Sequence, residues 1–177
     1  MGDRIMSQAV SFVGKERKEP SVFITEGGLY RMKIVKHEVD GYTNEGNEKH
    51  KYSFECNKVI KGADGKPALS TELYTLSNTY TIDQSQEWVF MNLADALKIQ
   101  TAFDPASLVG YYFMADVEMK PPYNKPDSDK LYANISPYSY KYSVANDSLP
   151  PVPPLVVENT QVQTQEAVID TGEEIPF

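Results

Sequence analysis

Leu29-Tyr-Arg-Met-Lys-Ile-Val-Lys-His-Glu-Val39 is the stretch that decides the fold, because its side chains alternate between two characters. The two parities are apolar Tyr30, Met32 and Ile34, and partly basic Arg31, Lys33 and Val35. A period of two is typical of a β-strand that buries one face and shows the other to solvent. We therefore predict a strand with an apolar face and a partly basic face.

The same period returns between Lys49 and Ile60. Here the alternating sets are Tyr52, Phe54 and Cys56, and Lys51, Ser53 and Glu55. Residues 40–48 between the two runs are rich in Asp, Asn and Gly, which form turns. Two alternating runs joined in this way predict a β-hairpin with a long connecting loop.

The rest of the chain predicts three more strands and one helix. Val89, Phe90, Leu93 and Leu97 follow helical spacing, so we expect a helix over Gln86–Gln100 with Asp83 or Ser85 as its cap. The other expected elements are a turn at Gly62–Pro67 and strands over Leu69–Leu76, Tyr111–Met119 and Leu131–Tyr142, with Ser77–Ser85 as a polar connection and Pro137 interrupting the last strand.

Three strands, a helix and two strands is the chain order of the oligonucleotide/oligosaccharide-binding barrel, the OB-fold. A β-sandwich would need about seven strands without the helix, and a doubly wound α/β sheet would need more crossover helices. We therefore expect an all-β fold, a five-stranded OB-fold barrel with one helix.

Charge and composition divide the chain into three parts. We expect an N-terminal arm over 1–20, the barrel over 21–146 and a disordered acidic tail over 147–177, which begins near the proline-rich run Pro150–Pro154. The net charge is −8, and the tail holds six acidic residues and no Lys or Arg. The remainder has 19 acidic residues against all 17 basic ones, so any nucleic-acid-binding face must be local.

The chain ends in Asp170-Thr-Gly-Glu-Glu-Ile-Pro-Phe177, an apolar tip on an acidic segment. Such a tip suits a peptide ligand, because a partner can offer an apolar pocket for Phe177 and a basic rim for the carboxylates. The ending resembles the acidic tip of single-stranded-DNA-binding proteins (SSBs) of bacteria and their phages, which finish in acidic residues followed by Ile-Pro-Phe. Leu108-Val-Gly-Tyr-Tyr-Phe113, which enters the fourth strand, is similar to phage SSB barrels as well.

The resemblance implies a function and a set of partners. The barrel would coat single-stranded DNA without sequence preference during replication, recombination and repair. The tip would recruit replication and recombination proteins through Glu173, Glu174, Ile175, Pro176 and Phe177. The resemblance also implies that the acidic tail competes with DNA for the basic face.

The residue types that bind single strands are present in the expected places. Such proteins stack bases on aromatic rings and hold phosphates with cations, and the chain has 12 Tyr and 7 Phe. An OB-fold ligand crosses strands 2 and 3 between the 1–2 and 4–5 loops. The candidates are Arg31 and Lys33 on strand 1, Tyr42, Lys49 and Lys51 in the 1–2 loop, Tyr74 on strand 3, and Lys120, Tyr123, Lys125 and Lys130 in the 4–5 loop.

Catalytic and metal-binding patterns are weak in the sequence. His37, His50 and Cys56 form no paired ligand motif, and no phosphate-binding glycine loop or hydrolase motif occurs. We expect a protein that is not an enzyme and has no cofactor. The alternatives are a protein-interaction adaptor with an OB-like barrel and a less favoured metal-dependent nuclease, for which Asp116 and Glu118 share one face of strand 4.

The sequence also carries expectations about location. Cys56 is the single cysteine, which excludes an internal disulfide, and neither a signal peptide nor an apolar run of membrane-spanning length is evident. We expect a cytoplasmic protein, in the bacterial host if a phage encodes it, with no membrane partner. Homo-oligomerisation is left open.

Overall fold

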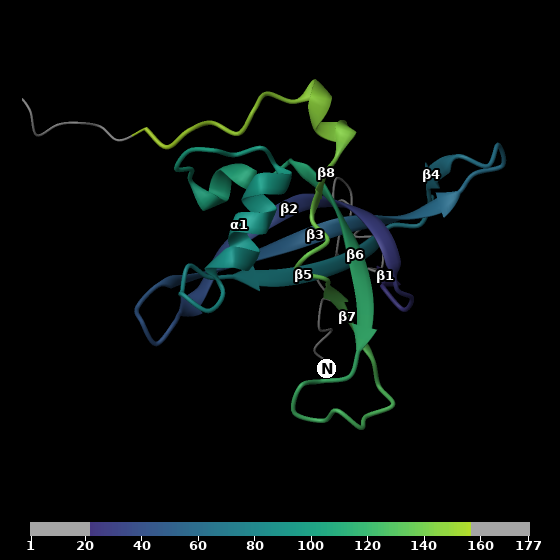
Figure 1. Ribbon diagram of the computed structural model, residues 1–177, viewed down its shortest axis with the longest axis horizontal. Coiled ribbons are helices and arrows are strands. Elements are labelled where there is room, and N and C mark those ends of the chain that lie inside the picture. Colours follow the sequence, from purple (N-terminus) through teal and green to yellow (C-terminus); the bar gives the residue numbers. More distant parts are fainter. Residues whose placement is uncertain (1–21, 157–177) are drawn as a thin grey trace, which may run out of the picture.

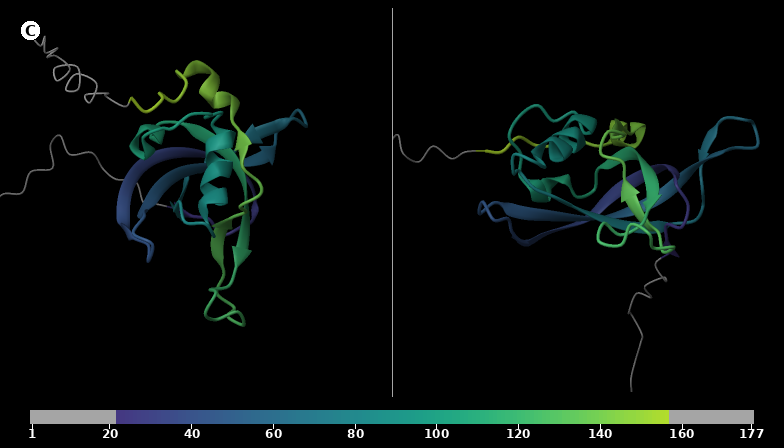
Figure 2. Two further views of the ribbon diagram at one scale, coloured as in Figure 1. Left: turned by 60° about the vertical axis from the view of Figure 1, so that its left-hand side comes forward. Right: turned by 60° about the horizontal axis from the view of Figure 1, so that its bottom comes forward.

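The hairpin of β2 (Gly28–Tyr42) and β3 (Glu48–Lys61) forms the centre of a strongly curled, half-barrel sheet (Figures 1 and 2). The structure, a computed structural model, describes residues 22–156. The other strands are β1 (Val22–Phe23), β4 (Pro67–Leu69), β5 (Tyr74–Tyr80), β6 (Tyr112–Lys120), β7 (Tyr132–Ile135) and β8 (Lys141–Tyr142). Within the described residues there is one α-helix, α1 (Glu87–Ala96), and there are two short 3-10 helices, η1 (Pro105–Leu108) and η2 (Val144–Ser148).

The strand order of the sheet is β1-β5-β3-β2-β6-β7. All these neighbours are antiparallel except β1 and β5. β4 pairs antiparallel with the last residues of β3, Val59–Lys61, and β8 pairs with β6 after the break at Pro137. The elements β2, β3, β5, α1, β6 and β7 follow the expected chain order, so the prediction of a barrel-like β-fold with one helix is confirmed.

The inner face of the sheet is filled with aromatic side chains. Tyr52 of β3 packs edge-on against Tyr80 of β5, with ring centroids 5.7 Å apart. Phe90 of α1 lies 5.5 Å from the ring of Tyr80, so the helix covers the inner face. Phe54 and Phe113 pair in the same way at 5.2 Å. Burial of these rings accounts for the alternating pattern that the sequence shows in β2 and β3.

The third strand is shifted along the chain from its expected position. It runs over Tyr74–Tyr80 instead of Leu69–Leu76, while Leu69 belongs to β4 and pairs with Val59. The polar residues Ser77 and Thr79 stand on the exposed side of β5, where they meet water. The polarity of these residues led us to expect a loop between the third strand and the helix. Their hydrogen-bonded pairing with β3 makes them part of the strand instead.

The expected cap of α1 was also wrong. Gln86 occupies the N-cap position, and no side chain caps the helix. Asp83 instead accepts hydrogen bonds from Thr43 Oγ1 at 2.9 Å and Asn47 Nδ2 at 2.7 Å. Asp83 therefore links the segment before α1 to the β2–β3 loop. Its carboxylate accepts from Thr43 and Asn47, which are distant in the chain, instead of from the N–H groups at the start of the helix.

A register shift in β2 between Ile34 and Lys36 brings two histidines together. Such a bulge changes which side chains face inward. A ring nitrogen of His37 lies 3.1 Å from one of buried His50, and the rings stack with centroids 5.3 Å apart. Burial, and then the neighbouring His37, lower the pKa of His50 below its usual value.

Residues 147–156 lie on the barrel, although we expected them to belong to the disordered tail. The Tyr111 hydroxyl donates a hydrogen bond to the Pro150 carbonyl at 2.7 Å, and the Leu155 N–H donates to the Ala102 carbonyl at 2.7 Å. Val152 packs half-buried against the core. The proline-rich run is held by these contacts, so the folded unit extends to Val156.

Residues 1–21 and 157–177 fall outside the described residues, and with them the predictions about the arm and the acidic tip. No helix between residues 22 and 156 has the length and apolar character needed to cross a bilayer.

We predict that a chain ending at Asn146 is less stable than a chain ending at Val156. The longer chain keeps the hydrogen bonds from Tyr111 and Leu155, the exposed hydrogen bond from Tyr142 to Asp147 and the contact of Val152, together worth about 2–3 kcal/mol of unfolding free energy. Both variants lack residues 157–177, so the difference reports on the docked segment alone. Urea unfolding followed by circular dichroism measures it, and equal midpoints would contradict the prediction.

We predict that His50 makes the fold less stable at mildly acidic pH. The pKa of His50 is lowered in the folded state, whereas it is about 6.5 in the unfolded chain. The unfolded state therefore binds more protons, and stability present above pH 6.5 is lost as the pH falls toward the lowered value. Urea midpoints between pH 7.5 and 5.5 should fall more steeply for the wild type than for His50→Phe; parallel slopes would refute this.

Candidate nucleic-acid interface

The outward-facing side chains of the curled sheet form a polar surface, which we call the outer face. They alternate with the buried residues of the same strands. The members of the outer face are Arg31 and Lys33 of β2, Lys49, Lys51, Ser53, Glu55 and Asn57 of β3, Thr75, Ser77 and Thr79 of β5, and Tyr112 and Met114 of β6. Cations stand here among small hydroxyl side chains, which leave room for a ligand.

Arg31 and Lys33 share one aromatic ring on the outer face. The Arg31 guanidinium carbon lies 5.1 Å from the ring centroid of Tyr112, and Lys33 Nζ lies 5.6 Å from it. These distances are within the range of cation–π attraction. The sequence predicted both cations but missed Tyr112, whose partners become visible only when β6 pairs with β2.

Lys49 and Lys51 belong to β3 and not to the preceding loop, as we had expected. Lys51 Nζ lies 3.7 Å from Glu38, which also pairs with Lys36 at 2.8 Å. The hydrogen bond from Lys36 is the main cause of the lowered pKa of Glu38. This end of the outer face therefore carries cations that are partly neutralised.

Tyr42 is the last residue of β2, beside the β2–β3 loop, and is 65% exposed. The loop is held at its base by Thr43 and Asn47, which both donate to Asp83. The ring of Tyr42 thus stands in solvent on a fixed support, as a stacking platform requires.

The loop between β6 and β7 projects from the body (Figures 1 and 2) and holds three of the predicted residues, whereas Lys120, which we expected in the loop, is the last residue of β6. Tyr123 is fully exposed, and Lys125 beside it is exposed as well. Lys130 Nζ lies 5.4 Å from the ring centroid of Tyr132, whereas Lys120 at the other end is paired with Glu118 at 2.6 Å. Turn hydrogen bonds from Lys125 to Pro122 and from Ser128 to Lys125 shape the loop.

Tyr74 does not lie on the outer face with the other predicted residues. Its ring packs edge-on against Tyr30 of the core, with centroids 5.8 Å apart. Its hydroxyl donates to Glu72 Oε2 at 2.7 Å, and this hydrogen bond is the main cause that raises the pKa of Tyr74 to about 12. The alternation in β5 turns Tyr74 inward, because Thr75 and Ser77 take the outer parity.

Phe23 is an exposed ring that sequence reasoning missed. It is 75% exposed, whereas its neighbour Ile24 is buried in the core. Phe23 and Thr75 line two adjoining hollows, one of about 400 Å³ over the outer face and one of about 500 Å³ that reaches Lys130 and Tyr132. Phe23 therefore joins the outer face to the β6–β7 loop. The alternation in Val22-Phe-Ile24 was the signal that could have identified it.

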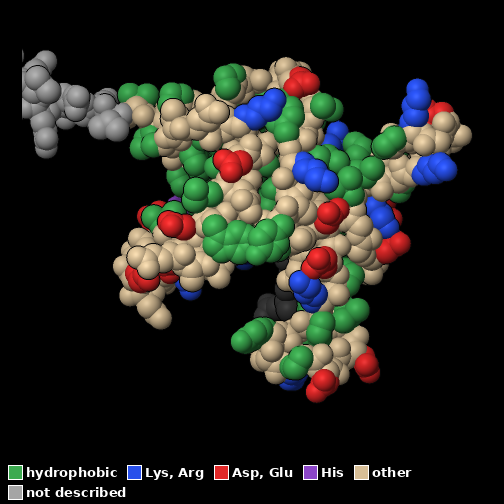
Figure 3. Space-filling model, in the orientation of Figure 1, with side chains coloured by type: hydrophobic (Ala, Val, Ile, Leu, Met, Phe, Trp, Pro, Cys, Tyr) green, Lys and Arg blue, Asp and Glu red, His purple; other side chains and the backbone are tan. Residues whose placement is uncertain are grey.

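A second aromatic group stands at the entrance of α1. Trp88 and Tyr138 stack with centroids 5.0 Å apart at 29°, and Tyr138 is 83% exposed. Asn92 Nδ2 donates to the Pro137 carbonyl at 2.7 Å and fixes the turn that carries Tyr138. Figure 3 shows an elongated group of apolar side chains at the lower end of α1.

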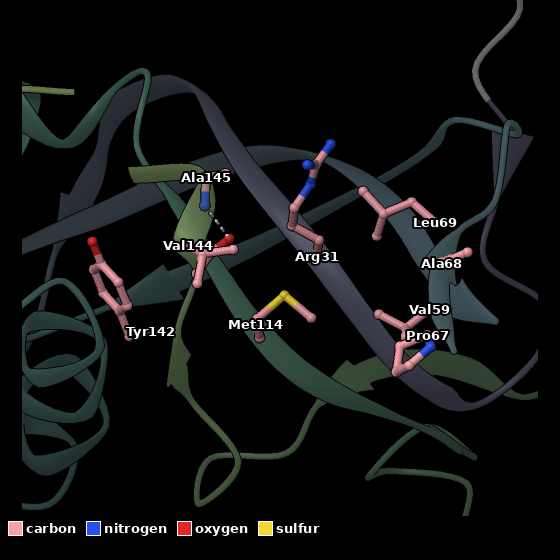
Figure 4. A pocket seen from close by; sticks show the side chains of 10 residues that line it. Arg31, Val59, Pro67, Ala68, Leu69, Met114, Tyr142, Val144 and Ala145 are labelled. Carbon is pink, nitrogen blue, oxygen red and sulfur yellow. Dashed lines mark hydrogen bonds between the residues drawn. The ribbon is translucent and has the colours of Figure 1, made fainter. Parts of the chain in front are cut away.

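An apolar groove of about 430 Å³ adjoins Arg31 (Figure 4). Its walls come from Val59 of β3, Leu69 of β4, Met114 of β6 and exposed Val144. Figure 4 shows the Arg31 guanidinium extending away from the ribbon of β2. Apolar walls with one cation suit a peptide or a base with a nearby negative charge.

Charge and metal-ligand placement complete the description of the surface. Residues 22–156 contain 17 acidic and 13 basic side chains, so the outer face is a local basic region on an acidic body. In this part of the chain, no three His, Cys, Asp or Glu side chains gather to hold a metal ion. Asp116 and Glu118 are exposed on β6, and Glu118 is paired with Lys120.

No protein-family model matches the chain, and no curated protein is significantly similar to it.

Proposed function

We propose that the protein binds single-stranded DNA without base preference and coats it during replication and recombination, without catalysis. One observation carries the proposal: rings on a curled half-barrel stand in solvent instead of in the core. They are Phe23, Tyr42, Tyr123 and Tyr138, each at least 65% exposed. Exposing such rings is unfavourable unless a partner covers them, and stacking on a ring suits every base.

In this proposal the single-stranded DNA would follow the two hollows beside Phe23. It runs from the hydroxyl-lined outer face at Ser53 and Ser77, past Phe23, to Lys130 and Tyr132 at the base of the β6–β7 loop. Bases would stack on Phe23 and Tyr123, while Lys125 and Lys130 would meet phosphates. Ser53, Thr75 and Ser77 are small members of a lining that also holds Glu55, and the space above them can take bases of any size, which fits binding without sequence preference.

Recruitment of replication and recombination proteins is the second half of the proposal. It rests on the sequence of the tip, Glu173-Glu-Ile-Pro-Phe177, in which apolar residues follow acidic ones. A basic rim around an apolar pocket on the partner would recognise both features.

A protein-interaction adaptor is the second candidate function. The apolar groove beside Arg31 favours it, because a groove of about 430 Å³ with apolar walls and one guanidinium fits an acidic peptide. The acidic balance of the described residues also disfavours general attraction to nucleic acid. In this case the protein would show no affinity for single strands, while the groove would bind peptide.

We predict that labelled poly(dT) binds with a moderate salt dependence. Because Lys51 and Lys120 face carboxylates, about three to five phosphate contacts are available, and the log–log salt slope should be about −2 to −3.5. Fluorescence anisotropy between 50 and 300 mM NaCl measures it. A slope near zero, or equal affinity for duplex DNA, would reject the function.

We predict that Phe23→Ala and Tyr123→Ala each weaken poly(dT) binding by about 5- to 150-fold, with little change in salt slope, because each removes a stacked ring. Lys125→Ala should flatten the slope by about 0.7. Tyr74→Phe is the matched control, because its hydroxyl bonds Glu72 away from the proposed path. Wild-type binding by both ring variants would show that the strand takes another path.

A further inference from the structure

The apolar groove beside Arg31, which we call the Arg31 groove, lies between two parts of the fold that the path past Phe23 does not use. They are the β3–β4 hairpin and the segment from β8 to η2. Figure 4 shows Val59 and Leu69 on one side of Arg31, and Met114 and Val144 on the other. Leu69 is 37% exposed and Val144 is 77% exposed, so the groove opens to solvent.

The charge at the Arg31 groove is positive. Arg31 lines it, and no Asp or Glu does so among the described residues. Arg31 and Lys141 pair with Met114 from opposite sides, so two cations flank one wall residue. Lys61 pairs with Pro67, another lining residue, at the opposite end. Within residues 22–156 none of these three cations forms a salt bridge with a carboxylate, so they are available to an anion.

The guanidinium of Arg31 is held in place by two neighbours. Its carbon lies 5.1 Å from the ring centroid of Tyr112, and one nitrogen lies 3.4 Å from Asn57 Oδ1. These contacts use one face and one nitrogen of a group that has five N–H donors. The remaining donors form a planar fork that matches a phosphate, and cation–π contact with a base is also open to such a group.

The Arg31 groove is continuous with the proposed path of the DNA along the outward-facing side of β3. Ser53 and Glu55 line the hollow beside Phe23, and Val59 lines the groove. From Glu55 to Val59 the backbone of β3 rises about 13 Å. Glu55 pairs with Lys33 of β2, so a cation stands opposite this carboxylate. DNA that leaves the hollow therefore reaches the groove without leaving the outer face.

We propose that the Arg31 groove binds one nucleotide unit of the single strand, with its base between Leu69 and Met114 and its phosphate at Arg31 and Lys141. A flat apolar ring that carries an adjacent phosphate matches both the walls and the cations. The inference rests on the proposed function, because the DNA that passes Phe23 supplies the nucleotide. It makes the β3–β4 hairpin and β8 a second point of attachment for the strand.

A second point of attachment raises the affinity for a long strand. Once the DNA lies beside Phe23, the next nucleotides meet the groove at a high effective concentration, because they are tethered about 13 Å away. Val59, Leu69, Met114 and Val144 have no hydrogen-bonding side-chain group that could read the edge of a base. The groove therefore adds affinity without adding a sequence preference.

The first test locates the ligand by ¹³C-methyl NMR of methionine in the full chain, with the Met114 signal assigned by Met114→Leu. A 20-nucleotide oligothymidylate, thymidine monophosphate and a ten-residue peptide of alternating leucine and glutamate are added separately. The oligonucleotide should shift the Met114 methyl at a nucleotide concentration about tenfold or more below that of the monophosphate, because the strand is tethered. The acidic peptide should leave the signal unchanged.

The second test adds a carboxylate to the groove. Val144→Glu should weaken oligonucleotide binding about three- to tenfold at 50 mM NaCl, because the new charge repels the phosphate. Val156→Glu is the matched control, since Val156 is 80% exposed, does not line the groove, and the same change in net charge results. Anisotropy of the labelled oligonucleotide measures both variants, and the difference between them reports on the groove alone.

Two further variants separate the phosphate contact from the base contact. Lys141→Gln should flatten the log–log salt slope by about 0.7, because one phosphate contact is lost. Leu69→Ser should weaken binding about threefold with the slope unchanged, because less apolar surface covers the base. A merely structural role of Lys141 would leave the salt slope at its wild-type value.

Three outcomes would overturn the proposal: equal losses for Val144→Glu and Val156→Glu, a Met114 shift with the acidic peptide and none with the oligonucleotide, or equal potency of thymidine monophosphate and the strand. The second outcome would assign the groove to a peptide, and the third to a free nucleotide. Wild-type affinity in Val144→Glu together with a loss in Phe23→Ala would remove the groove and leave the proposed function standing. An oligonucleotide that does not bind at all would reject both.

Discussion

Packing of aromatic rings against one another on the inner side of the sheet is the interaction on which the rest of the structure depends. A strongly curled sheet encloses a wide interior, and Tyr52, Tyr80 and Phe90 fill it with large rigid rings. The polar ends of the tyrosines are also satisfied. The Tyr52 hydroxyl donates to the Pro105 carbonyl at 2.8 Å, and the hydroxyls of Tyr80 and Tyr140 lie 2.6 Å apart. These bonds hold η1 and the β7–β8 connection against the barrel.

Because the inner parity is occupied by these rings, the outer parity is free for other roles. Strand alternation alone turns Arg31, Lys33 and Ser53 outward once Met32 and Phe54 are buried. The exposed rings come from a different source, the ends of strands and the loops. Phe23, Tyr42 and Tyr123 stand near strand ends or in a loop, and no second layer within residues 22–156 covers them. The proposed path of the DNA therefore runs along the places where the buried core ends and aromatic rings are exposed.

The docked segment 147–156 is held by residues that are distant from it in the chain. Its hydrogen bonds with Tyr111 and Ala102 hold Pro150 beside β6 and Leu155 beside the segment before η1. A proline-rich segment loses little backbone freedom on docking, so a few contacts are sufficient to hold it.

The sequence by itself determined the fold class and much of the core. The period of two in Leu29–Val39 and Lys49–Ile60, the helical spacing at Val89–Leu97 and the order of elements led to a barrel-like sheet with one helix, because these patterns record which side chains avoid water. It also identified most cations near the outer face. Only the tertiary structure decided that Tyr74 faces inward, that Asp83 binds the β2–β3 loop instead of capping α1, and that the proline-rich run docks on the core. In each case the partner is distant in the chain, and local sequence does not encode which distant group competes best for a ring, a carboxylate or a backbone carbonyl.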